Sequence, residues 1–520
     1  MDFNLLLGSI GAVLNPFSLI YIFIGAAGGV LIGCIPGLTA TMGIALLVPF
    51  TYGLDLIPAV GMLLGIFCGG MYGGSISAIL IHTPGTPAAA ATIMDGYPMA
   101  KRGESSRALS IALFSSFLGG MIGALCMTFL SPYISRMALR FGPAEFFALA
   151  VFGLSVIISI SGKSITKGLI TAFFGLLIST VGMDKTCAYL RFIKLRGFYD
   201  GIPFIPALIG LFAISEVLAG IEQNLSTKKT EAKISGVLPS LSDIKAILRN
   251  VVTGGLIGSV IGSIPGAGGD IAAFVSYSEA KRESKHPEKF GTGVPEGIAA
   301  SESANNGCSG GAMIPMLSLG VPGDSNTAVL MGAFIMKGFQ PGPMMYVEHL
   351  DIVYAVFASL ILANLAMLVV GMAGVKLFAK IISVERKLLL PAILVLSLVG
   401  AYAINQNMFD VYFAVAMGVI GYLLQKYGFP LSPILLALIL GPMSESNLRR
   451  FMQIDDGHFF AILSKPICVV FLLLAIASLV TSVINQMRIN KRLAAQKQQA
   501  DQPQAPQDEA QPNQADQPQD

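Results

Sequence analysis

The sequence predicts an all-α polytopic membrane protein, with about twelve spanning helices in two internally related, inverted halves that contain broken or re-entrant half-helices. Three observations lead to this prediction. Of 520 residues, 54% are hydrophobic and 12% charged, and the mean hydropathy of +0.72 excludes a water-soluble protein. Long uncharged stretches exceed the roughly 20 residues that cross a bilayer. Short Pro-Gly motifs also recur in the same order in both halves.

The expected spans follow from apolar runs between polar or Pro/Gly breaks. They lie near 17–35, 56–81, 107–130, 144–162, 165–183, 202–222, 251–264, 297–319, 350–376, 388–406, 409–425, 430–443 and 465–487. Some of these are expected to be half-spans. No Lys or Arg precedes Lys101, so the N-terminus lacks the positive region of a cleavable signal, and we expect it to stay in the mature chain.

Composition divides the chain into five parts. We expect a first repeat half over 1–221, a polar connecting loop over 222–250, a second half over 251–446, a loop with an extra C-terminal span over 447–487, and a disordered tail over 488–520. Basic residues directly after the last span predict a cytoplasmic C-terminus. Lys101, Arg102 and Arg107 do not fit a simple alternation of these spans.

The internal repeat rests on three matches at nearly constant spacing. The motif GCIPG at 33–37 recurs as GSIPG at 262–266, TPGT at 83–86 recurs as VPGD at 321–324, and GIPFIPALIGLFAISE at 201–216 resembles FPLSPILLALILGPMSE at 429–445. Gly/Pro interruptions at corresponding positions of two halves indicate the binding site of a secondary transporter. The alternative is that they are only helix kinks, because Gly and Pro are common in spanning helices.

Each interruption is expected to end one helix and begin another. Irregular backbone survives at membrane depth only where protein or a water-filled cavity surrounds it, and a helix N-terminus offers free N–H groups and partial positive charge to an anion. The predicted substrate-binding residues are Thr83, Pro84, Gly85, Thr86, Pro322, Gly323, Ser325, Asn326 and Thr327. The alternative role of the polar side chains is to cap the new helices.

A cation site is expected beside the anion site. Oxygen atoms freed at the breaks, together with the amides and the carboxylate of the second half, are suitable ligands for a sodium ion. The predicted set is Pro36, Gly37, Pro265, Gly266, Asp270, Asn305 and Asn306. Two alternatives stay open: SESANN at 301–306 caps a helix at the membrane interface, and Asp270 and Glu302 are simply solvated.

Several function classes are excluded or disfavoured. The net charge of +3, with no basic cluster interleaved with aromatics, argues against a nucleic-acid partner. The six cysteines show no metal-ligand or disulfide spacing. The glycine-rich run at 69–74 has no Walker lysine and indicates close helix packing. We therefore expect no enzyme, no cofactor and no metal other than a coupling sodium ion.

Long, ordered motifs then carry a family resemblance. The segments GCIPGLTATMGIALLVPF, GGMYGGSISAILIHTPGTPAAAATIMDGYPMAKRG, GSIPGAGGDIAAFVSYSEAK and SESANNGCSGGAMIPMLSLGVPGDSNTAVLMGA closely resemble the large membrane subunit of the bacterial tripartite tricarboxylate transporters, from about residue 15 to 485. The resemblance implies an inner-membrane, multi-pass permease that works with a small membrane subunit and a periplasmic solute-binding protein. It implies symport of organic carboxylates such as citrate, driven by Na⁺ or H⁺.

One residue departs from the pattern that this resemblance implies. Asp324 follows Pro322-Gly323, where the family more often has a small neutral residue. An acid at this helix start would repel a carboxylate such as citrate unless it were protonated, paired or used on a cation. The competing function is a channel or a membrane scaffold without coupled transport.

Overall fold

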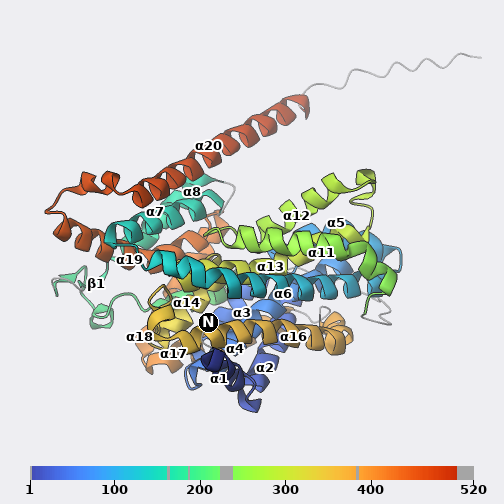
Figure 1. Ribbon diagram of the computed structural model, residues 1–520, viewed down its shortest axis with the longest axis horizontal. Helices are drawn as coiled ribbons and strands as arrows, with labels where there is room; N and C mark the ends of the chain where they lie inside the picture. The colour runs from blue at the N-terminus through green and yellow to red at the C-terminus, as the bar shows by residue number, and fades with distance from the viewer. Residues whose placement is uncertain (1–2, 161–163, 185–187, 223–237, 382–385, 501–520) are drawn as a thin grey trace, which may run out of the picture.

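A computed structural model describes residues 3–160, 164–184, 188–222, 238–381 and 386–500, and most of these residues are helical (Figure 1). Within this part of the chain, one short antiparallel hairpin joins β1 (Gly182–Met183) to β2 (Leu190–Arg191). The predicted all-α class is therefore confirmed.

The first half contains the helices α1 (Phe3–Val13), α2 (Pro16–Cys34), α3 (Ala40–Leu47), α4 (Leu56–Ile81), α5 (Ala90–Lys101), α6 (Ser105–Ala138), α7 (Pro143–Ile160), α8 (Ile165–Ser179), α9 (Phe204–Leu208), the π-helical turn η4 (Ile209–Ile214) and α10 (Ser215–Glu222). The second half contains α11 (Leu241–Gly262), α12 (Gly269–Glu283), α13 (Pro295–Leu319), α14 (Ser325–Met336), α15 (Met345–Glu348), α16 (Leu350–Ile381), α17 (Arg386–Asn405), α18 (Met408–Lys426) and α19 (Ser432–Ile454). Helix α20 (Pro466–Ala500) follows, and short 3₁₀ turns are η1 (Pro49–Thr51), η2 (Pro87–Ala89), η3 (Arg196–Phe198), η5 (Pro287–Lys289) and η6 (Phe459–Ser464).

Several boundaries differ from the sequence prediction, including the start of α11 and the end of α20. Helix α11 begins at Leu241, ahead of the expected 251, because Ser240 and Asp243 form a reciprocal capping box that starts a helix inside the polar segment. Helix α20 continues to Ala500, although disorder was expected from 488. Residues 501–520 and most of the connecting loop, 223–237, lie outside the described residues.

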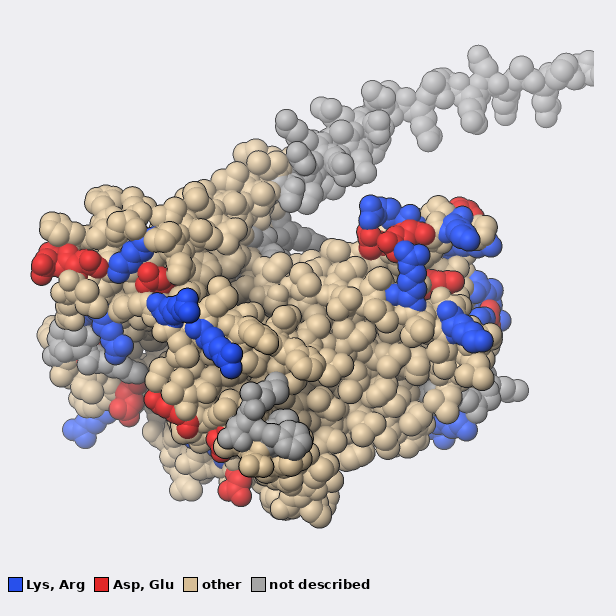
Figure 2. Space-filling view, in the orientation of Figure 1, with Lys and Arg blue, Asp and Glu red and all other residues tan. Residues whose placement is uncertain are grey.

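The described helices match a multi-pass membrane protein. Eight are long and apolar enough to span: Pro16–Cys34, Leu56–Ile81, Ser105–Ala138, Phe204–Glu222, Leu241–Gly262, Leu350–Ile381, Met408–Lys426 and Pro466–Ile484. Shorter apolar helices cover Pro143–Val156, Ile165–Ser179, Ser325–Met336 and Leu389–Asn405. Figure 2 shows charged side chains gathered at two opposite ends of the molecule, with an uncharged surface between them. That distribution suits a hydrocarbon belt.

Each half is built around a pair of parallel helices that almost touch. On α2 and α4 the pairs in register are Gly25 with Met62, Gly29 with Ile66, and Gly33 with Gly70, and on α11 and α13 they are Gly254 with Ala300, Gly258 with Ala304, and Gly262 with Cys308. A β-carbon at Gly25, Gly29, Gly33, Gly254, Gly258 or Gly262 would collide with the backbone of the partner helix. Small residues four apart allow such close contact, which explains the glycine-rich runs of the sequence.

Corresponding helices of the two halves run in opposite directions. Asn305 of α13 donates from Nδ2 to the Met71 carbonyl of α4 at 3.3 Å, while the earlier Cys68 faces the later Ser309. The same holds for α6 and α16, where Gly120 lies against Asn364 and Leu113 against Gly371. Since a later residue on one helix meets an earlier residue on the other, the halves have the inverted relationship that the sequence favoured.

The halves also exchange helices. The third long helix of the first half, α6, packs on α11 and α13, whereas its counterpart α16 packs on α2 and α4. In the same way, α19 packs on α7 and α8, while η4 and α10 pack on α17 and α18. The structural units are therefore a core (α2–α6, α11–α14 and α16) and an arm (α7–α10 and α17–α19), each built from both halves of the sequence (Figure 1).

The arm lies on one side of the core. Turn η4 and helix α17 pack on α3, and α19 packs on α14. The counterparts of α3 and α14 are α12 and α5, and these pack on the core helices α11, α13, α4 and α6. The inverted symmetry of the core therefore does not extend to its contacts with the arm.

Candidate functional site

The first pair of interruptions has the same backbone in both halves. After α2, Gly37 adopts φ 88°, and after α11, Gly266 adopts φ 89°, a left-handed conformation that favours glycine. A new helix then starts in each half: Thr39 is the N-cap of α3 and accepts from the Met42 N–H at 3.2 Å, and Gly268 is the N-cap of α12. Both predicted breaks are therefore real ends and restarts.

The second pair is also equivalent. Helix α4 ends at His82 (φ 58°) and α13 ends at Gly320 (φ 72°), both in the left-handed region. The chain restarts at Thr86, the N-cap of η2 and so of the segment that continues into α5, and at Asp324, the N-cap of α14. The two breaks of the second half are also in contact, because the Gly266 N–H donates a hydrogen bond to the Gly323 carbonyl at 2.6 Å.

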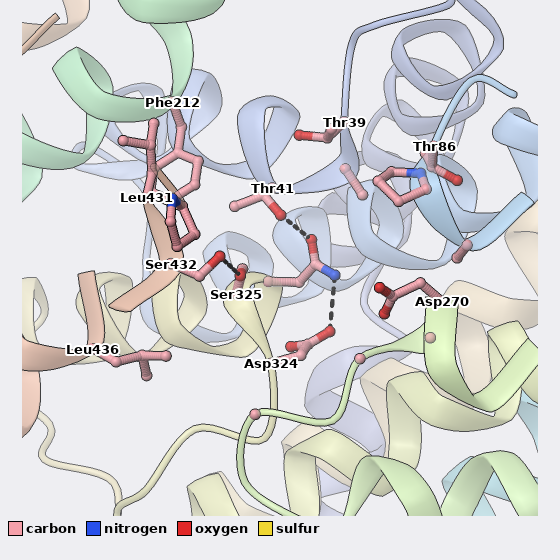
Figure 3. A pocket seen from close by; sticks show the side chains of 18 of the residues that line it. Thr39, Thr41, Thr86, Phe212, Asp270, Asp324, Ser325, Leu431, Ser432 and Leu436 are labelled. Atoms are coloured by element: carbon pink, nitrogen blue, oxygen red, sulfur yellow. Dashed lines mark hydrogen bonds between the residues drawn. The ribbon is translucent and has the colours of Figure 1, made fainter. Parts of the chain in front are cut away.

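The four N-cap residues line one cavity of about 550 Å³ between core and arm (Figure 3). The core contributes the starts of α3, η2, α12 and α14, and the arm contributes η4, α10, the end of α18 and the start of α19. The lining residues are Thr39, Ala40, Thr41, Met71, Thr86, Pro87, Ala88, Phe212, Glu216, Gly266, Gly268, Gly269, Asp270, Asp324, Ser325, Asn326, Gln425, Phe429, Pro430, Leu431, Ser432 and Leu436. The N-terminal ends of several helices thus converge on one space.

A chain of hydrogen bonds crosses this cavity from one half to the other. The Thr41 hydroxyl donates to Asn326 Oδ1 at 2.7 Å, and Asn326 Nδ2 donates to Asp324 Oδ2 at 2.9 Å, as the dashed lines in Figure 3 show. Asp324 Oδ1 also accepts from the backbone N–H and the hydroxyl of Thr327, at 2.8 and 2.7 Å. Asp324 therefore caps its own helix and is held in place from both halves.

The charges of the lining are all negative. Asp270, Asp324 and Glu216 face the cavity, and among the described residues that line it there is no Lys, Arg or His. The first-half wall offers the neutral hydroxyls of Thr39, Thr41 and Thr86, and the Thr86 hydroxyl is buried without a hydrogen-bond partner among the described residues. Within the core, the first-half side of the cavity is thus neutral, and the second-half side carries Asp270 and Asp324.

The predicted substrate residues divide into lining and framework. Thr86, Ser325 and Asn326 line the cavity, and Ser325 shares a 2.9 Å hydrogen bond with Ser432 of the arm. Thr327 is occupied by capping, and Thr83 is exposed, with its hydroxyl 3.4 Å from the Ile81 carbonyl. Of the remaining four, Pro84, Gly85, Pro322 and Gly323, none lines the cavity, and the two glycines allow close approach: a β-carbon on either would collide with backbone.

The predicted cation residues are more dispersed. Gly266 and Asp270 line the cavity and Pro265 does not, whereas Pro36 and Gly37 line a small crevice with Leu390. Asn305 and Asn306 are fully buried on α13, and the Oδ1 atom of each has no hydrogen-bond partner among the described residues.

Asn305 lies directly behind the acidic wall of the cavity. A β-carbon on Gly269, in the first turn of α12, would be 2.8 Å from Asn305 Oδ1. This amide oxygen is therefore a neighbour of Asp270 and an unused ligand for a cation. In the described part of the chain no group of three or more His, Cys, Asp or Glu residues is arranged to hold a metal ion, so amide, hydroxyl and carbonyl oxygens would have to supply most ligands of a sodium ion.

Sequence reasoning missed several lining residues. Thr39 and Thr41 follow the first Pro-Gly break directly, and their position at a helix restart was a usable signal. Glu216 and Ser432 lie in the segments that revealed the third repeat match, but nothing in the sequence indicated that these segments approach the breaks. The tertiary fold brings the arm onto the site.

Comparison with known proteins agrees with this architecture. The family model described as "Tripartite tricarboxylate transporter TctA family" matches residues 19–436. An uncharacterized 52.8 kDa protein from the TAR-I ttuC' 3' region of Agrobacterium vitis is 36% identical over 486 residues, which cover 93% of this chain and 97% of the relative. An uncharacterized protein from the TAR-II ttuC' 3' region of the same organism is 36% identical over 231 residues, covering 44% of this chain and 96% of that relative.

No solved structure shows significant similarity to the chain. The family match extends from helix α2 to α19 and so includes all four interruptions and both walls of the cavity. The long relative covers the same elements at 36% identity. The chain belongs to the tripartite tricarboxylate transporter TctA family.

Proposed function

We propose that this chain is the permease subunit of a binding-protein-dependent secondary transporter that imports organic carboxylates by symport with Na⁺ or H⁺. Family membership supports a role as the membrane subunit, with a small membrane subunit and a periplasmic solute-binding protein as partners in the bacterial inner membrane. The observation that carries the proposal is the single cavity onto which four helix starts converge. Such a site suits an anion without a basic side chain.

The charges of the cavity explain why transport would require a cation. A carboxylate entering a space lined by Asp270 and Asp324 meets like charge, and no Lys, Arg or His is among the described residues that line this space. Cations bound at the acidic wall remove this repulsion. Substrate and cation then favour each other's binding, which is the thermodynamic basis of symport.

We assign the two ligands to opposite walls. The carboxylate lies against the hydroxyls of Thr39, Thr41 and Thr86, with Ser325 and Asn326 at the second-half side. The cation lies near Asp270 and Asp324, where the Gly266 backbone and the Asn305 amide oxygen add neutral ligands. The Thr41–Asn326–Asp324 hydrogen-bond chain connects the two positions directly.

The distribution of basic residues gives the proposed orientation. Arg102 donates to the Thr292 and Gly293 carbonyls of the α12–α13 loop, and Arg107 pairs with Asp243 of α11. The antiparallel course of α6 and α16 brings the end of α16, with Lys380, to the same side. Helices α5 and α12 also end there, and the excess of Lys and Arg makes this the cytoplasmic side. Lys101, Arg102 and Arg107 fit this side because the short re-entrant helices change the count of crossings.

The position of the arm gives the proposed movement. The arm packs on α3 and α14. It therefore does not cover the side of the site formed by α12 and α5, which faces the cytoplasm in the proposed orientation. Moving the arm to the pseudo-symmetric position against α12 and α5 would expose the site to the opposite side. Alternating access would thus be a movement of core against arm, and not of one sequence half against the other.

Transport should be tested with the complete system. The permease, its small subunit and its binding protein are reconstituted in proteoliposomes, and uptake of labelled carboxylates is followed with and without imposed Na⁺ or pH gradients. Accumulation above the external concentration only under a gradient supports symport. Equilibration to equal concentrations would instead favour a channel, and no flux with any carboxylate would favour a scaffold.

A further inference from the structure

A buried carboxyl group outside the cavity has no role in the site described above. Glu302 lies in the second turn of α13 and is fully buried. Its Oε1 accepts from the Thr92 hydroxyl of α5 at 2.5 Å, and its Oε2 accepts from the Ser116 hydroxyl of α6 at 2.8 Å. Glu302 belongs to the second half of the chain and both donors belong to the first, so the carboxyl lies where the two halves meet inside the core.

No positive charge compensates this carboxyl in the described structure. Arg107 of α6 pairs with Glu104 and Asp243, and Arg249 of α11 pairs with Glu283. Hydroxyl dipoles alone do not offset the cost of a bare carboxylate in a dry interior. Neutralisation by a bound cation or a proton is therefore required for much of the time.

The titratable groups on the surrounding helices do not supply that charge. Helix α4 presents Tyr72, α5 presents Asp95, α12 presents Asp270 and Tyr277, α13 itself presents Cys308, and the N-cap of α14 is Asp324. All of these are acids or neutral groups. Asp95 is in addition fully used, since it accepts from the backbone N–H groups of Gly291, Gly293 and Val294 and from the Tyr277 hydroxyl.

A neighbouring hydroxyl can serve both protonation states. Tyr72 of α4 interacts electrostatically with Glu302, and its hydroxyl is buried without a hydrogen-bond partner among the described residues. A hydroxyl can donate to the ionised carboxylate and can accept from the O–H of the neutral acid.

We propose that Glu302 is a reversible proton-binding site of the transport cycle. A proton is favoured over a metal ion because both carboxylate oxygens already accept hydrogen bonds from the hydroxyls that hold them. The site is also mechanically connected to the cavity. Thr92 lies on α5, directly after the η2 turn that begins at the cavity with Thr86 as its N-cap, and Asn305 of the same turn of α13 lies behind Asp270. Loss or gain of the proton changes the hydrogen bond that holds α5 to α13.

The binding of the proton can be tested without transport. Infrared difference spectra of the purified protein in lipid, recorded over a pH titration, should show the carbonyl stretch of a protonated carboxylic acid that disappears in Glu302→Gln. Glu296→Gln, on the first turn of the same helix, is the matched control and should keep the band. Glu302→Asp should retain a band at a shifted midpoint. Identical spectra of the wild type and Glu302→Gln at every pH would overturn the proposal.

Its role in coupling rests on the proposed transport function and has a separate test. In proteoliposomes, Glu302→Gln should keep substrate exchange close to the wild-type rate but lose about tenfold or more of the uptake driven by a pH gradient. An unchanged response to the pH gradient in this variant would reject the coupling role. A wild type that fails to transport any carboxylate would overturn the transport function instead, and the infrared result would still decide whether Glu302 binds a proton.

Discussion

Thr86 and Asp324 occupy the same place in the two halves, yet they differ in charge and in bonding. Each is the N-cap that starts the helical segment after the second break of its half. The Thr86 hydroxyl is buried without a partner among the described residues, whereas the Asp324 carboxylate accepts from Thr327 and Asn326. Equivalent N-cap positions thus carry the unpartnered hydroxyl of Thr86 in one half and the hydrogen-bonded carboxyl group of Asp324 in the other.

The difference shows what duplication followed by divergence allows. Two identical helix starts would attract either two anions or one anion that contacts both starts. Under the proposed function, an acid as N-cap cancels the attraction at one start and favours a cation there, while the other start keeps its affinity for a carboxylate. The inverted repeat would then provide adjacent sites of opposite preference within one cavity.

The largest expected effect tests whether the two halves depend equally on their close contacts. Gly85→Ala would drive a β-carbon into the Gly33 carbonyl, and Gly323→Ala would place one 2.5 Å from Ala312 Cα. We expect both variants to lose uptake almost completely and to lose about 1–3 kcal/mol of stability or more, as overpacked sites do. Uptake and thermal unfolding in detergent are the measurements.

Gly28→Ala is the control for these variants, because open space surrounds Gly28 on α2. It should insert, unfold and transport like the wild type. Wild-type uptake by both Gly85→Ala and Gly323→Ala would contradict the proposed packing of the breaks and with it the geometry of the cavity.

The next effect concerns the acidic wall. Asp270→Asn should raise the Na⁺ or H⁺ concentration required for half-maximal uptake by about tenfold or more, since it removes a charge from the proposed cation position. Glu283→Gln, on the exposed end of the same helix, is the matched control. The measurement is uptake at saturating substrate over a cation titration. Equal cation dependence of Asp270→Asn and wild type would remove Asp270 from the site.

A smaller effect is expected for the amides behind that wall. Asn305→Ala and Asn306→Ala each remove an unpartnered amide oxygen but leave both acids in place. If either oxygen binds the cation, its loss should raise the cation concentration required for half-maximal uptake by roughly three- to tenfold, which corresponds to about 1 kcal/mol. Cation titration separates the two residues. A sodium response that stays normal at normal expression would exclude that residue as a ligand.

The smallest effect tests the neutral wall. Thr86→Val keeps the shape of the side chain but removes the unpartnered hydroxyl, so half-maximal uptake should require about three- to tenfold more substrate while the cation dependence stays the same. Thr83→Val, three positions earlier and exposed, should change neither value. A shift in cation dependence with Thr86→Val would contradict the assignment of substrate and cation to opposite walls.

Much of the fold could be predicted because its signals are local. Apolar length placed α2, α4, α16 and most other spans, and Pro36-Gly37 and Pro265-Gly266 marked real helix ends. The boundary of α11 was missed because its first turns are polar and only the Ser240 capping box reveals the start. Short helices such as α3 and α14 were expected only as unspecified half-helices.

The site was predicted less completely, since the set of residues that line the cavity depends on contacts between distant parts of the chain. Thr86, Asp270 and Asn326 were among the predicted site residues, and they line one cavity. Pro36 and Gly37 line a different crevice although their counterpart Gly266 lines the cavity, because the arm covers α3 and leaves α12 uncovered. No local pattern reports that asymmetry.

The sequence by itself determined which segments enter the membrane, where their helices stop, and that the halves are copies, since hydropathy and the dihedral limits of Pro and Gly act within a few residues. Only the tertiary structure decided that α6 and α16 change places, that Thr39 and Thr41 share a cavity with Asp324, and that Glu302 meets Thr92 and Ser116. Those contacts join residues far apart in the chain and depend on how whole helices pack.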